Sequence, residues 1–196
     1  PYDWLEASFF YTRNKAQKYC GVLDDPACNQ SLKDKGFNLK VRLKEEGFLP
    51  AIAIGFNDLA GTGLYASEYI VASYGRDNID FHFGLAWGAL DGSKNNFRNP
   101  LKYIYDGFEN RPTRVSINDT GQFEPGRYFS GESTSPFFGV SYAFNEDLLI
   151  KLENDTTLTP GLVNYEDSKI EFSLSLDYKI NQNFNIGIAH ERGNYF

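Results

Sequence analysis

The feature that most constrains this chain is a strict alternation of apolar residues with polar or small ones. It is clearest in residues 79–88 (IDFHFGLAWG), where Asp, His, Gly and Ala separate large apolar residues. Successive side chains of a β-strand point to opposite faces, so this pattern predicts a strand with one apolar and one polar face.

The same alternation recurs along the chain and predicts about nine strands and no helix. We expect the strands at residues 5–13, 37–44, 48–57, 64–74, 79–88, 137–144, 148–154, 169–179 and 184–191.

The connections between these strands differ in length. Residues 45–47, 75–77, 145–147 and 181–183 carry the Gly, Asn and Asp that tight hairpins require. The links at residues 14–35, 89–135 and 155–169 are long, and residues 57–63 (NDLAGTG) form an intermediate one. Short turns at one end and longer loops at the other are typical of outer-membrane barrels.

The predicted fold is therefore an all-β, antiparallel, up-and-down transmembrane β-barrel, or a barrel segment of about nine to ten strands. Residues 1–196 would form a single barrel domain or segment, and the absence of Met suggests an excerpt of a longer chain. In such a barrel lipid meets the apolar face and the polar face lines the lumen. We expect Phe81, Phe83, Leu85 and Trp87 to contact lipid.

Charged and polar residues of the opposite face are the candidates for lining the lumen. They would form a ladder of ion pairs across a wet interior, or a path for a charged glycan in which a basic row attracts acidic sugars. The candidates are Lys40, Arg42, Lys44, Glu68, His82, Lys151, Glu171 and Asp177.

Composition and motifs exclude several functions. With 26 acidic and 19 basic residues, the chain lacks the positive field that nucleic acids require. It contains no GxSxG, P-loop, HExxH or zinc-binding spacing, so we expect no enzymatic activity, no metal and no cofactor.

The two cysteines, Cys20 and Cys28, enclose seven residues. This spacing predicts a disulfide in an exposed loop and hence an oxidising compartment. Two unpaired thiols, or a metal pair lacking other ligands, are the alternatives.

Several segments carry a resemblance to a known family: DWLEASFFYTR, FHFGLAWG, FRNP, FGVSYAF, LIKLEND, HERGN and a long block from Lys33 to Ser73. The most specific part is LPAIAIGFNDLAGTGLYASEY. Together they resemble the YjbH family of Gram-negative outer-membrane proteins linked to exopolysaccharide production.

This resemblance implies an outer-membrane β-barrel that serves polysaccharide secretion or surface assembly, often as part of a larger chain. Its expected partners are outer-membrane lipid, polysaccharide, and other barrel segments or secretion proteins. The alternative is a soluble carbohydrate-binding or lipocalin-like β-protein, which would be purified without detergent.

Overall fold

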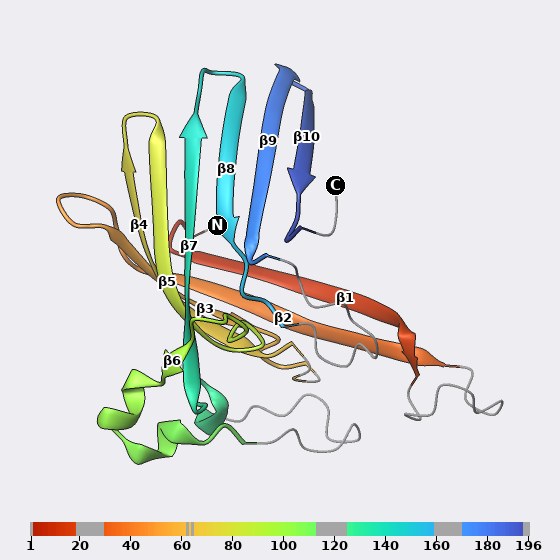
Figure 1. Cartoon of the computed structure of the whole chain (residues 1–196), viewed down its shortest axis with the longest axis vertical. Helices are drawn as coiled ribbons and strands as arrows, with labels where there is room; N and C mark the ends of the chain where they lie inside the picture. The colour runs from red at the N-terminus through yellow and green to blue at the C-terminus, as the bar shows by residue number, and fades with distance from the viewer. Residues whose placement is uncertain are drawn as a thin grey trace.

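The computed structural model describes residues 2–18, 30–61, 63, 65–112, 125–158 and 170–193. One antiparallel sheet of ten strands dominates it (Figure 1). The strands are β1 (Leu5–Lys18), β2 (Ser31–Lys44), β3 (Ala51–Asn57), β4 (Ser67–Arg76), β5 (Ile79–Gly88), β6 (Phe97–Arg98), β7 (Ser133–Ala143), β8 (Leu148–Asn154), β9 (Phe172–Asn181) and β10 (Phe184–His190).

The strands form an up-and-down meander. Their order in the sheet is β1-β2-β3-β4-β5-β7-β8-β9-β10, and the short β6 pairs with β7 beside this path. The all-β, antiparallel prediction is confirmed. The predicted closure into a barrel is not confirmed, because in the described part of the chain β1 and β10 are the two open edges of the sheet.

The tight turns have the predicted chemistry. Asp77, between β4 and β5, has a positive φ of 55°. Asn145 and Asn181 each accept hydrogen bonds through Oδ1 from the backbone N–H groups two and three residues ahead. Such Asn and Asp residues favour the sharp reversals that connect adjacent antiparallel strands.

Cross-strand register gathers large apolar side chains on one face of the sheet. Ile70 lies opposite Ile54 and Leu85, and Phe83 lies opposite Phe138. Much of this face is exposed, at Phe9, Phe37, Ile70, Tyr74, Phe81, Phe83, Phe138, Tyr142, Leu152, Phe172, Leu174, Leu176, Tyr178, Ile186 and Ile188. The strands thus turn an apolar surface outward.

Correspondingly, few apolar side chains of the described residues are buried. Among the described apolar residues only Ala53, Ala66, Ala86 and Trp87 are classed as buried. A typical soluble domain buries its large aliphatic and aromatic residues. Here many of these residues are exposed, so the usual distribution of apolar side chains is inverted.

The connection between β5 and β7 contains structure that the sequence pattern does not predict. Besides β6 it forms the 3₁₀ helices η1 (Pro100–Tyr103), η2 (Asp106–Glu109) and η3 (Pro125–Arg127). These helices lie at one end of the sheet, in green at the bottom of Figure 1.

The expectation that Trp87 contacts lipid is wrong. Its side chain is only 1% exposed. The cause is Phe129 from the same connection, whose ring meets Trp87 edge to face with centroids 5.2 Å apart.

Cys20 and Cys28 lie outside the described residues, so their disulfide remains a prediction. In the described part of the chain, no helix has the length and apolar character needed to span a membrane.

Candidate functional site

The polar face of the sheet holds a cavity of about 450 Å³. Its walls come from strands β2, β3, β4, β5, β7 and β8 and from two loop segments. Because six strands reach one space, the sheet curves around it. The lining residues include Lys40, Ala53, Tyr69, Val71, Ser73, His82, Leu90, Phe137, Gly139, Glu153, Asp155 and Thr156.

Two aromatic rings of this cavity pack directly against glycines of the sheet. A Cβ added at Gly55 would lie 2.1 Å from Cζ of Tyr69, and one added at Gly84 would lie 2.3 Å from Cζ of Phe137. Each ring therefore rests on the glycine directly across from it in the neighbouring strand. The two rings also meet edge to face, with centroids 6.1 Å apart. The glycines make this close packing possible.

Polar groups stand beside these rings. His82 Nδ1 lies 2.8 Å from Ser73 Oγ, and both side chains belong to adjacent strands. Lys40 forms an exposed ion pair with Glu6, with Nζ and Oε2 3.4 Å apart. The cavity thus combines aromatic surfaces with hydrogen-bonding groups, as small-molecule sites commonly do.

Two loop segments border the cavity and bind each other. The N–H of Gly92 donates to the Thr156 carbonyl at 3.0 Å, and that of Leu158 donates to the Ala89 carbonyl at 2.7 Å. Thr156 Oγ1 also donates to the Leu90 carbonyl at 2.7 Å.

Leu90 lines a second cavity as well, of about 470 Å³. Its other lining residues are Phe10, Thr12, Asn38, Asn57, Tyr65, Ser67, Ala89 and Thr157.

Glu171 fixes this loop region. Its carboxylate accepts hydrogen bonds from Ser93 Oγ at 3.0 Å and from the N–H of Lys94 at 2.6 Å, and Asn154 donates a third. Burial raises the pKa of Glu171, but these hydrogen bonds outweigh it and hold the pKa below its ordinary value. This predicted lumen residue therefore anchors a loop.

The other predicted charged residues do not form a continuous row. Only Lys40 and His82 of the predicted set line the cavity of about 450 Å³. Lys151 and Asp177, on β8 and β9, form an ion pair of 2.7 Å.

The other basic residues of β2, Arg42 and Lys44, interact with nearby loop residues and do not line the cavity. Arg42 pairs with Glu45 at 3.2 Å. Lys44 donates to the backbone carbonyls of Leu49 and Pro50.

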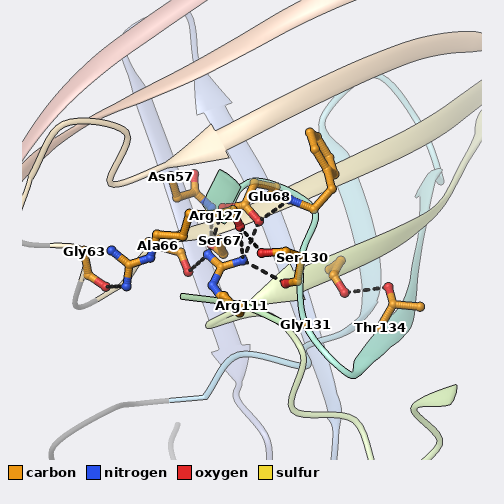
Figure 2. A network of polar contacts seen from close by, with 12 residues as sticks. Asn57, Gly63, Ala66, Ser67, Glu68, Arg111, Arg127, Ser130, Gly131 and Thr134 are labelled. Carbon is orange, nitrogen blue, oxygen red and sulfur yellow. Dashed lines mark hydrogen bonds and ion pairs between the residues drawn. The ribbon is translucent and has the colours of Figure 1, made fainter. Parts of the chain in front are cut away.

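Glu68 lies on the opposite face from the predicted one. It stands across from Phe56 and Trp87 in the neighbouring strands, because its position in β4 is in phase with the apolar Ile70. Its carboxylate is fully buried and forms a bidentate ion pair with the guanidinium of Arg111, with N–O distances of 2.8 and 2.9 Å (Figure 2).

Arg111 fastens the β5–β7 connection to the sheet. Its guanidinium also donates to the backbone carbonyls of Ala66, Arg127 and Ser130. The N–H of Phe129 donates to Glu68 at 3.0 Å. No motif or periodicity singles out Arg111, because it reaches Glu68 from a segment without alternation.

Further contacts hold this connection in place. Asn99 is fully buried, and its Nδ2 donates to the carbonyls of Phe108, Phe129 and Gly131. Phe56 meets the rings of Tyr128 and Phe129 edge to face. We interpret the Glu68–Arg111 cluster as a structural latch, meaning that it holds the β5–β7 connection against the sheet. Its charged groups are already engaged by internal hydrogen bonds and the ion pair.

A second buried acid follows β3. Asp58 is 4% exposed, has a φ of 54°, and accepts a hydrogen bond from the N–H of Tyr65 at 3.2 Å. Burial and the nearby Asp34 raise the pKa of Asp58 to about 6. Gly36 permits this placement, since a Cβ there would lie 2.5 Å from Asp58 Oδ1.

Within the described residues, no group of three or more His, Cys, Asp or Glu side chains is placed to hold a metal ion.

Comparison with known proteins gives one family. The family described as "YjbH: Exopolysaccharide biosynthesis protein YbjH" matches residues 1–196. A relative from Escherichia coli (strain K12), named "Uncharacterized lipoprotein YjbH", is 34% identical over 198 residues. The match covers 100% of this chain but only 28% of that relative. No solved structure matches.

Proposed function

Because the chain belongs to the YjbH family, we propose that it is part of an outer-membrane β-barrel that serves exopolysaccharide secretion or surface assembly. In this proposal the exposed apolar face contacts lipid and the polar face surrounds the path or binding site of the polysaccharide. The protein acts by binding and guiding, without catalysis.

The observation that carries this proposal is the inverted distribution of side chains. Phe81 and Phe83 are 48% and 57% exposed on one face of β5, while His82 between them lines the cavity on the other. Water disfavours a broad apolar surface of this kind, whereas the hydrocarbon core of a bilayer accepts it. The family description supplies the link to exopolysaccharide.

The second candidate is a soluble carbohydrate-binding β-protein, which the cavity alone would also support. The two candidates differ in what covers the apolar face. Membrane fractionation of cells producing the full-length protein, followed by extraction with and without detergent, distinguishes them. A monodisperse protein recovered without detergent would exclude the membrane proposal.

The role in exopolysaccharide is tested in cells. Deletion of the gene should lower the exopolysaccharide released to or retained at the surface, and the intact gene should restore it. An unchanged amount and location of exopolysaccharide would contradict the role while leaving the membrane location standing.

A further inference from the structure

We propose that the cavity of about 450 Å³ on the polar face of the sheet binds an uncharged sugar unit, stacked against Tyr69 and Phe137. This inference rests on the proposed function and specifies the chemical class of its ligand. It follows from three properties of the cavity: its aromatic surfaces, its hydrogen-bonding groups and its charge.

The aromatic surfaces are held in place before any ligand arrives. Tyr69 and Phe137 each rest on a glycine of the adjacent strand, and each limits the movement of the other through their edge-to-face contact. The C–H groups of a pyranose ring form an apolar patch that packs well on such a fixed aromatic surface. Fixed rings also reduce the entropy lost on binding.

The hydrogen-bonding groups suit hydroxyls. With Nδ1 of His82 engaged by Ser73, its Nε2 is the ring nitrogen available to a ligand. Glu153 and Thr156 also line the cavity. A volume of about 450 Å³ lies within the range of pockets that take small ligands.

The charge of the cavity favours a neutral sugar over an acidic one. Among the described lining residues, Lys40 is the only Lys or Arg, and it already pairs with Glu6. Glu153 and Asp155 bring negative charge to the same space. Because Arg42 and Lys44 are engaged elsewhere, the basic row expected to attract acidic sugars does not assemble here.

Isothermal titration of the full-length protein tests this inference. The protein is kept in a zwitterionic detergent without a sugar headgroup, and the probes are cellohexaose and a galacturonic acid hexamer of equal length. We expect cellohexaose to bind with a Kd in the millimolar range or tighter, and the acidic hexamer to bind more weakly.

Variants at Tyr69 connect binding to the cavity. Tyr69→Phe keeps the ring and should bind cellohexaose nearly as well as the original protein. Tyr69→Leu fills similar space without a flat ring and should weaken binding by about tenfold, the loss expected for one good stacking contact. Tyr142→Leu, on the opposite face of β7, should change nothing.

Three results would overturn the inference: tighter binding of the acidic hexamer, equal binding by Tyr69→Phe and Tyr69→Leu, or no binding at about 10 mM cellohexaose, where a millimolar site would be largely occupied. These results are separate from the proposed function. A protein that fractionates with membranes and supports exopolysaccharide output, yet fails here, refutes only the neutral-sugar site.

Discussion

At the residue scale, the ion pair between Glu68 and Arg111 is the interaction most open to a direct test. Their side chains are 0% and 18% exposed. Glu68→Gln keeps the shape but leaves the guanidinium without its anion, which costs about 3–5 kcal/mol when a buried pair loses one partner. We expect a loss of this size in the free energy of unfolding, measured by urea titration in detergent.

The control for this change is Glu6→Gln. Its ion pair with Lys40 has side-chain exposures of 72% and 46%. Exposed pairs contribute roughly 0–1 kcal/mol, so this variant should unfold almost as the original protein does. Equal losses in both variants would contradict the assignment of Glu68 as a buried latch.

Asp58 gives a second residue-scale prediction, about pH. Its pKa is raised from 3.8 to about 6 in the folded protein, so the folded state binds this proton more tightly than the unfolded chain does. The stabilising contribution is complete below the unfolded value of 3.8 and is lost as pH rises through the folded value of about 6. It amounts to roughly 3 kcal/mol.

Asp58→Asn should remove this pH dependence, because Asn tolerates a positive φ and cannot ionise. Urea unfolding at a pH below 4 and at neutral pH should show a smaller difference for the variant than for the original protein. Asp77→Asn is the matched control, since Asp77 has nearly the same φ of 55° but a side chain that is 88% exposed. A pH response that survives Asp58→Asn would assign it to another group.

The limits of sequence reasoning are also clearest at single residues. The polar face could be predicted for His82 because this residue alternates with Phe81 and Phe83. The structure places His82 in the lining of the cavity. Trp87 has the same local pattern as its neighbours in β5, but the ring of Phe129 covers it. That contact joins residues far apart in the chain, and alternation carries no information about it.

At the element scale, β5 tests the orientation of the whole sheet. Phe83 is 57% exposed on the apolar face. At such a position Arg costs about 2–4 kcal/mol near the middle of a bilayer, but very little on a surface in water. Phe83→Arg should therefore destabilise the protein folded into phospholipid bilayers by this amount.

His82→Arg is the comparison within the same strand, since His82 lines the cavity and does not lie on the apolar face. It should cost clearly less than Phe83→Arg in the same bilayers. If Phe83→Arg folds in bilayers as readily as the original protein, the proposed lipid contact of this face is wrong.

Strands were predictable for a physical reason that does not extend to the β5–β7 connection. Alternation is local, so it survives in the sequence whichever strands become neighbours. Accordingly the predicted strand at residues 148–154 matches β8, and that at 79–88 matches β5. The helices η1 and η2 depend instead on Asn99, which bonds carbonyls up to 32 residues away. Such contacts leave no periodic signal.

At the scale of the whole molecule, the open edges of the sheet have a consequence for the proposed membrane location. Among the strands that the structure describes, β1 pairs only with β2, and β10 pairs only with β9. A lipid-exposed edge would leave a row of backbone N–H and C=O groups without partners, at several kcal/mol per group. The chain spans 28% of the length of the relative it matches. We therefore expect strands elsewhere in the full-length protein to pair with both edges.

Amide hydrogen exchange can test this expectation on the full-length protein in lipid. Amides of β1 and β10 should be protected to a degree similar to those of the central β5, because paired strands exchange only through opening. A version limited to residues 1–196 should lose protection at both edges and keep it in β5. Persistent protection in this shorter version would mean that β1 pairs with β10 directly. Rapid exchange at both edges of the full-length protein would contradict closure altogether, and with it the proposal that this sheet spans a bilayer.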